Sequence, residues 1–168
     1  MVQAYYGGAT GVLVSGLVWL IASIAGVFHT PTTSMIVLLV GGMFIFPISV
    51  LFSKILGLSG KHSEQNVLSH LAFEGLGILF CGIFLAFTLF HINPQLFFPV
   101  MLLTIGARYL TFQTLYGLKV YWIFGAVLIT GGFISMIFSL PFIVGAFIGG
   151  IVELIFALFI FSQSKRHM

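Results

Sequence analysis

Six long apolar runs, separated by short polar breaks, dominate the hydropathy pattern of the chain. The runs fall at about residues 9–28, 34–53, 66–90, 95–116, 120–138 and 142–161. Each has a length of about 20 residues, which a helix needs to cross the hydrocarbon core of a bilayer. Transmembrane β-strands are about half as long and alternate in polarity. The pattern therefore predicts an all-α fold, a bundle of six transmembrane helices in one domain over residues 1–168.

Composition supports this class and excludes several others. The chain has 168 residues, of which only six are Lys or Arg and three are Asp or Glu, while 60% are hydrophobic. Soluble domains carry about 25% charged residues, so this chain lacks the polar groups needed to cover a surface in water. The net charge of +3 is not gathered into a basic patch. We therefore expect the lipid bilayer as partner and no nucleic acid.

The basic residues outside the runs predict the orientation of the chain. All of them lie in the second connection, the fourth connection or the C-terminal tail: Lys54, Lys61, Lys119, Lys165 and Arg166. The other side has none. Because Lys and Arg favour cytoplasmic loops, we expect a bacterial cytoplasmic membrane protein with both termini in the cytoplasm. The aromatic residues expected in a belt at that interface are Tyr5, Tyr6, Tyr116, Tyr121 and Trp122.

A weak internal similarity relates the first three runs to the last three. Glycine pairs at 41–42 and 131–132 lie in similar apolar sequence, and Glu74 and Glu153 occur in the third and sixth runs. Two such halves would have opposite orientations in the membrane, as in many transporters. A 3+3 inverted repeat is one interpretation. Chance similarity is the other, because glycine pairs are common in apolar sequence.

Three charged residues lie inside the apolar runs, namely Glu74, Arg108 and Glu153. Each costs about 2.5–3.5 kcal/mol at the centre of a bilayer on insertion scales. With a rise of about 1.5 Å per residue, each lies roughly 12–13 Å from the cytoplasmic end of its run. We therefore expect the three side chains at one depth, as one polar cluster.

Two main interpretations of this cluster remain open. In a structural or accessory membrane subunit, the arginine bridges carboxylates and locks helices together. In a small transporter or permease-like protein, the excess carboxylate takes up a proton or cation, and this is our leading hypothesis. Arg108 could instead extend alone to the interface. His70 lies four residues before Glu74 on the same helix face and would assist the site, but two ligands are too few for a metal.

Small residues at four-residue steps predict close helix contacts in the first and last runs. The candidates are Gly7, Gly11 and Ser15 in the first run, and Gly145, Gly149 and Ala157 in the last. Such faces let helix backbones approach closely, within one bundle or between copies in a homo-oligomer. Glu153 lies on the second of these faces, so it should point into a helix contact rather than into lipid.

Motifs for catalysis or cofactor binding are missing from the sequence. It contains no Gly-rich phosphate loop, no His-Glu-x-x-His, no Cys-x-x-Cys and no Asp. We therefore expect no enzymatic activity, no cofactor and no metal.

Several short stretches resemble a family of small bacterial integral membrane proteins of unknown function. They cover about half of the chain and comprise Phe46-Pro47, Ser53-Lys54-Ile55-Leu56, Gly106-Ala107, Tyr109, Phe112, Tyr116 and Tyr121. The resemblance implies a six-helix protein of the inner membrane. It implies no particular activity.

Overall fold

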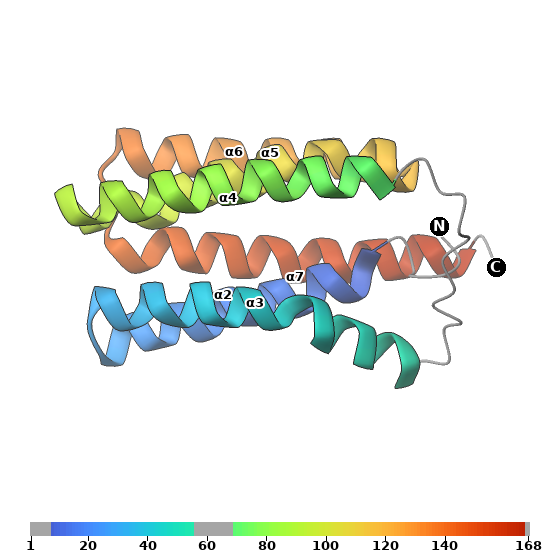
Figure 1. The fold of residues 1–168 in the computed structure, drawn as a ribbon, viewed down its shortest axis with the longest axis horizontal. Helices are drawn as coiled ribbons and strands as arrows, with labels where there is room; N and C mark the ends of the chain where they lie inside the picture. Colours follow the sequence, from blue (N-terminus) through green and yellow to red (C-terminus); the bar gives the residue numbers. More distant parts are fainter. Residues whose placement is uncertain (1–7, 56–68, 167–168) are drawn as a thin grey trace.

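The protein forms six long helices in a computed structural model that describes residues 8–55 and 69–166, with side chains omitted at 69–73 and 164–166. The helices are α2 (Ala9–Phe28), α3 (Pro31–Ile55), α4 (Ser69–Ile92), α5 (Phe97–Tyr116), α6 (Val120–Ile137) and α7 (Phe142–Arg166) (Figure 1). A short 3-10 helix, η2 (Pro94–Leu96), leads into α5. Each of these six long helices contains a segment that is long enough and apolar enough to cross a membrane. The predicted all-α fold is confirmed, and the helices indicate a multi-pass membrane protein.

The helix ends follow local signals in the sequence. The helices begin and end within three residues of the predicted runs, except that α7 continues to Arg166. Helix α3 begins earlier than predicted, at Pro31, because proline is accommodated in a first turn where its missing N–H needs no partner. The Thr30 hydroxyl accepts a hydrogen bond from the Thr33 N–H there, at 3.2 Å. Helix α5 ends at Tyr116. The next residue, Gly117, has a φ of 72°, the left-handed conformation that glycine adopts readily.

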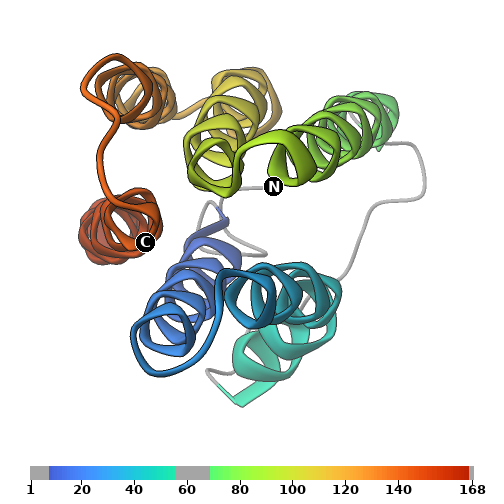
Figure 2. The ribbon, with the colours of Figure 1, turned by 90° about the vertical axis from the view of Figure 1, so that its left-hand side faces the viewer.

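The helices follow one another round the bundle in the order of the sequence (Figure 2). Helix α5 packs between α4 and α6, and α2 packs between α3 and α7. Contacts of α7 with α6 and α2 join these two groups. Helices α3 and α4 are the least buried of the six. The centre of the bundle is therefore built mainly by α2, α5, α6 and α7.

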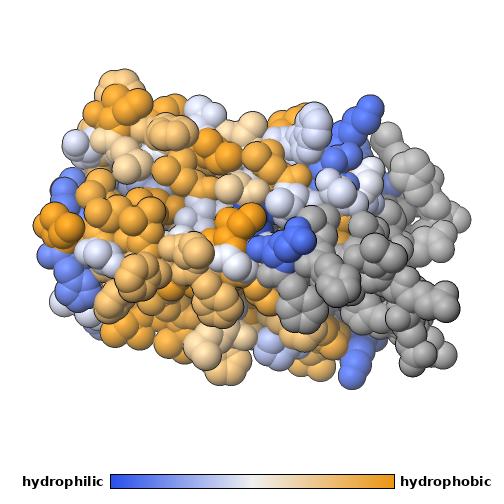
Figure 3. Space-filling model, turned by 45° about the horizontal axis from the view of Figure 1, so that its top comes forward, coloured by the Kyte–Doolittle hydropathy of each residue, from blue (hydrophilic) through white to orange (hydrophobic). Residues whose placement is uncertain are grey.

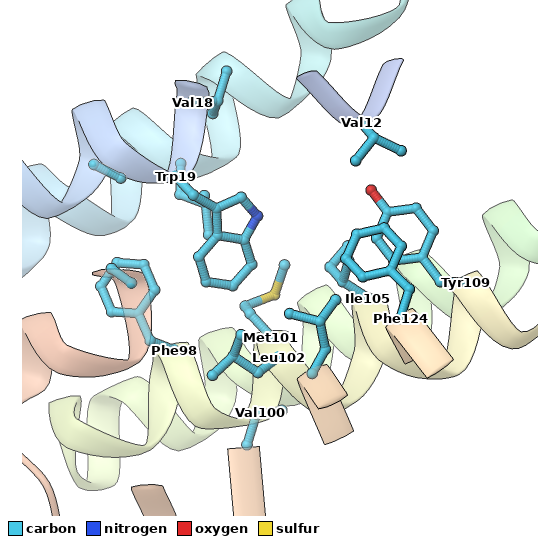
Figure 4. Close-up of a cluster of buried hydrophobic side chains, with 14 of the residues drawn as sticks. Val12, Val18, Trp19, Phe98, Val100, Met101, Leu102, Ile105, Tyr109 and Phe124 are labelled. Carbon is cyan, nitrogen blue, oxygen red and sulfur yellow. The ribbon is translucent and has the colours of Figure 1, made fainter. Parts of the chain in front are cut away.

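Aromatic and aliphatic side chains fill this centre (Figure 4). Trp19 of α2 is 2% exposed and lies against Phe98 of α5, with ring centroids 5.7 Å apart. Leu102 of α5 and Phe124 of α6 are fully buried beside them in the same core. A charged group inside such a core therefore has few polar partners.

The outer surface is apolar over most of its length. Large hydrophobic side chains on several helices are exposed, for example Phe46, Phe84 and Ile137. On the face drawn in Figure 3, apolar residues form a broad region between more hydrophilic ends. This distribution suits a protein whose lateral surface is covered by lipid.

Candidate functional site

Glu153 lies near the middle of α7, eleven residues after its start at Phe142. It is fully buried, and it is the only charged side chain among the described residues that is. Helix α2 approaches closely at this point, since a Cβ on Gly16 would lie 3.1 Å from the Glu153 Cβ. The missing side chain of Gly16 therefore leaves room for the glutamate. Glu153 points into the bundle, as its small-residue face predicts.

Hydroxyl groups from two other helices contact the carboxyl group of Glu153. The Tyr109 hydroxyl of α5 donates to Oε1 at 3.1 Å. Ser15 of α2 lies next to the same carboxyl group. The second oxygen, Oε2, is buried and has no hydrogen-bond partner. A buried polar atom without a partner costs about 1–3 kcal/mol, so the unpaired Oε2 destabilises this part of the core.

Aromatic stacking holds Tyr109 in place. Its ring stacks on Phe124 of α6 with centroids 4.1 Å apart, and Phe124 stacks on Phe156 of α7 at 4.5 Å. Helices α5 and α6 are in backbone contact nearby, because a Cβ on Gly106 would lie 2.8 Å from the Gly125 carbonyl oxygen. The Tyr109 hydroxyl is therefore presented to Glu153 by a rigid set of rings from three helices.

Arg108 is half-buried on the neighbouring position of α5. Its guanidinium carbon lies 5.4 Å from the centre of the Phe112 ring, a cation–π arrangement. Its Nε atom is buried without a hydrogen-bond partner. Arg108 lies close enough to Glu153 to interact with it electrostatically. The structure nevertheless records no ion pair between these two described residues, so the guanidinium is near the site but not bonded to it.

Glu74 has no described hydrogen bond or ion pair with Arg108 or Glu153, and the three-residue cluster stays a prediction. The side chain of Glu74 is exposed. The predicted start of this run at residue 66 lies outside the described residues, which resume at Ser69 in α4. The adjacent Gly75 does pack near Arg108, because a Cβ there would lie 3.7 Å from Nε. The side chain of His70 is outside the described residues, so its contact with Glu74 stays a prediction.

The predicted packing residues divide into two groups. Those of α7 lie at close contacts: a Cβ on Gly145 would lie 2.8 Å from the Phe98 Cβ, one on Gly149 would overlap the Trp19 indole, and Ala157 is fully buried. In α2, Ser15 is buried and Gly7 lies outside the described residues.

Gly11 makes no close helix contact within the described part of the chain. A Cβ there would have no atom within 4 Å, apart from the helix's own backbone. The contact with α7 is instead at Gly16, because helix crossing fixes the point of approach and sequence spacing alone does not. The face of Gly145 and Gly149 is occupied within the chain whereas Gly11 is open, and a homo-oligomer through these faces stays a prediction.

Sequence reasoning did not identify Tyr109 as a site residue. A signal was present in composition, since the chain has 20 Phe but only five Tyr. Tyr121, expected in an interfacial belt, is also fully buried, whereas the adjacent Trp122 is 60% exposed and faces outwards.

Metal ligands do not gather in the described part of the chain, where no group of three or more His, Cys, Asp or Glu side chains could hold an ion. The site therefore consists of one carboxyl group, one phenol, one hydroxyl and a nearby guanidinium. Such a set can exchange a proton or hold a small cation.

Comparison with known proteins identifies a family but no activity. A family model described as a family of unknown function (DUF7010) matches residues 1–163. No curated protein and no solved structure matches the chain. The expected relation to an uncharacterised family is confirmed. Because the matching model covers almost the entire chain, the protein belongs to this family of unknown function.

Proposed function

We propose that the protein is a small membrane transporter in which Glu153 takes up and releases a proton or a small cation. The observation that carries the proposal is a fully buried glutamate with one oxygen lacking any partner. Ionisable residues inside membrane bundles are costly, and they commonly mark ion pathways and proton relays. Glu153 fits that description by its position, its burial and its incomplete hydrogen bonding.

A fixed ion pair is the less suitable explanation of Glu153. Buried ion pairs stabilise only when their geometry is excellent and the remaining lone pairs are satisfied. Arg108 lies over Phe112 instead, and Oε2 of Glu153 is unsatisfied. Protonation would remove the buried charge, and a bound cation would give Oε2 a partner. Both changes lower the free-energy cost of burying an incompletely paired carboxylate. The carboxyl group therefore suits the exchange of a proton or cation better than a permanent ion pair.

Arg108 serves in this proposal as a fixed positive charge near the exchange site. Guanidinium groups stay protonated in proteins. Its proximity to Glu153 stabilises the carboxylate after the proton or cation has left. Glu74 and His70 have no described contact with Glu153, so Glu74 becomes the matched control for experiments.

We also propose that the protein lies in a bacterial cytoplasmic membrane, with both of its termini on the cytoplasmic side. Lys54 at the end of α3 and Lys119 before α6 lie at the end of the bundle where α2 begins and α7 ends (Figure 1). Lysines favour the cytoplasmic side. The bilayer is the proposed partner, and no enzymatic activity or cofactor is part of the proposal.

The 3+3 inverted repeat stays a prediction. In its favour, Gly41 of α3 lies against Val18 of α2, and Gly132 of α6 lies against Leu103 of α5, so one glycine of each pair faces the first helix of its half. Against it, the helices of the first half and those of the second half follow one another in the same direction round the bundle (Figure 2). An inverted repeat would make the second half run in the opposite direction.

The test of the proposed function is flux in reconstituted liposomes that contain a pH-sensitive dye. Glu153→Gln keeps the shape of the side chain but cannot ionise, and Glu74→Gln is the same change at the exposed position. We expect Glu153→Gln to abolish protein-dependent proton flux and Glu74→Gln to retain most of it. Folded protein with equal flux in the wild type and Glu153→Gln would contradict the proposal.

The alternative function is a structural or accessory subunit. One observation favours it, because the hydrogen bond from Tyr109 to Glu153 joins α5 to α7 and could serve as a helix lock. On that account the wild type shows no flux above empty liposomes, and Glu153→Gln lowers only the yield of folded protein. The same experiment therefore separates the two functions.

A further inference from the structure

The tyrosines of the described part of the chain form one continuous series. Tyr109 stacks on Tyr121 of α6, with centroids 6.0 Å apart and planes at 27°. Tyr121 stacks on Tyr116 at the end of α5, with centroids 5.7 Å apart and planes at 26°. The first ring of the series donates its hydroxyl to Glu153. The series therefore leads away from the buried carboxyl group.

The other end of the series lies where α2 begins. A Cβ on Gly8, the residue before α2, would lie 2.7 Å from the Tyr121 hydroxyl oxygen and 3.1 Å from the Tyr116 ring. Gly8 has a φ of 87°, and it can lie against these rings because it has no side chain. In Figure 4 the Tyr109 hydroxyl points towards Val12, which is one turn further along α2. The phenol groups thus span the distance between Glu153 and the end of the bundle.

Packing alone does not explain three phenol groups in this place. The chain fills most aromatic positions with Phe, of which it has 20. Ser23 and Thr104 are buried and donate to carbonyls of their own helix, at Trp19 and Val100. Ser34 is buried as well and donates to a carbonyl of another helix, that of Ala22. The Tyr109 hydroxyl instead donates to a carboxyl group of another helix. Tyr121 is fully buried, so an interfacial role does not account for its hydroxyl.

We propose that Tyr109 and Tyr121 form the route by which protons travel between Glu153 and the end of the bundle where α2 begins. The inference rests on the proposed function, in which Glu153 exchanges a proton. In each transfer, the Tyr109 hydroxyl gives its proton to Oε1 of Glu153, the Tyr121 hydroxyl gives its proton to the Tyr109 oxygen, and water at the end of the bundle gives a proton to the Tyr121 oxygen. Each phenol loses one O–H bond and gains one, so neither ring keeps a net charge, and the water is left as hydroxide.

The groups around Glu153 define what else could influence this transfer. Helix α5 contributes Tyr109 and Arg108, and α2 contributes the hydroxyl of Ser15. Tyr121 of α6 is one ring further away, and no other charged described residue lies on α7 between 142 and 163. Since Arg108 stays protonated, the hydroxyls of Ser15 and of the phenols are the described groups that can pass a proton to the carboxyl, and only the phenols continue towards the end of the bundle.

The test follows protonation of Glu153 in the complete protein in liposomes after a rapid pH jump. Infrared spectroscopy detects the carbonyl band of a protonated carboxyl group, and Glu153→Gln identifies which band belongs to Glu153. The variants are Tyr109→Phe and Tyr121→Phe, each of which removes only a hydroxyl. Thr104→Val is the matched control, because it removes a buried hydroxyl of α5 that bonds its own helix.

We expect both tyrosine variants to slow the appearance of the band by about tenfold or more, since a positioned proton-transfer group typically contributes about 10²–10⁴-fold. Thr104→Val should keep the wild-type rate. Tyr121→Phe is the sharper variant, because it leaves the hydrogen bond between Tyr109 and Glu153 in place. Tyr121→Phe should slow the protonation of Glu153 without changing its final extent. If Tyr109→Phe does not fold, the result for Tyr121→Phe alone tests the route.

Two other results would overturn the route in distinguishable ways. If Tyr121→Phe and Tyr109→Phe respond as fast as Thr104→Val, protons reach Glu153 by another path while the proposed exchange at Glu153 stands. If the wild type shows no pH-dependent band that Glu153→Gln removes, the exchange itself fails and the route fails with it.

Discussion

Substitution of Gly149 by alanine tests the close contact between α7 and α2 that places Glu153. The added Cβ would overlap the Trp19 indole and would lie 2.7 Å from its Cδ2 atom. Favourable carbon–carbon contacts lie at about 3.5–4.0 Å. Trp19 has little freedom to move, because it is 2% exposed and lies against Phe98. We therefore expect the two helices to separate locally or the indole to leave its preferred rotamer.

The expected magnitude follows from overpacking. One extra methyl group in a well-packed core costs about 1–3 kcal/mol, and replacing glycine by alanine within a helix returns roughly 0.5–1 kcal/mol. Gly42→Ala in α3 is the matched control, since a Cβ there would meet nothing within 4 Å outside the local backbone of its own helix. Both variants gain the same stabilisation from replacing glycine by alanine within a helix. The difference between their free energies of unfolding therefore measures the clash with Trp19, about 1–3 kcal/mol.

The assay is reversible unfolding of the purified protein in mixed micelles, followed by helix circular dichroism and by tryptophan fluorescence. Gly149→Ala should unfold at a lower denaturant fraction than Gly42→Ala, with a similar slope. Equal free energies of unfolding for the two variants would refute the packing of α2 against α7 at this position.

Three further predictions address other parts of the chain. Ser34→Ala should lower the free energy of unfolding by about 0.5–1.5 kcal/mol, because the buried Ser34 hydroxyl donates to the Ala22 carbonyl of α2 at 2.6 Å. The control is Ser49→Ala, which removes a hydrogen bond within α3. A loss of stability for Ser34→Ala no larger than for Ser49→Ala would contradict the prediction. Cys81 is exposed within α4, so a lipid-soluble thiol reagent should label it and a charged reagent should not; fast labelling by the charged reagent would place it in water. A C-terminal green fluorescent protein should fluoresce and a C-terminal alkaline phosphatase should be inactive, and the opposite pair of results would reverse the proposed orientation.

The helices could be predicted from the sequence because length and local signals decide them. Uninterrupted apolar runs in lipid must satisfy their backbone groups within one segment. Breakers such as Pro31 and Gly117 then mark the ends.

The candidate site was predictable only in part. The inward direction of Glu153 follows from the small residues spaced along its face of α7, which is a local pattern. The roles of Gly16 and Tyr109 depend on where α2 and α5 cross α7, and no pattern within one helix contains that information. For the same reason, equal depths estimated along separate helices could not show that Glu74 and Glu153 meet.

Counting protons bound by the folded protein tests the central claim, that Glu153 exchanges a proton inside the bundle. The wild type, Glu153→Gln and Glu74→Gln would be titrated with acid and base in lipid nanodiscs, with circular dichroism to confirm that each stays folded. The wild type should bind about one proton per chain more than Glu153→Gln, as expected for one accessible carboxyl group. Identical titration curves for the wild type and Glu153→Gln would contradict the claim.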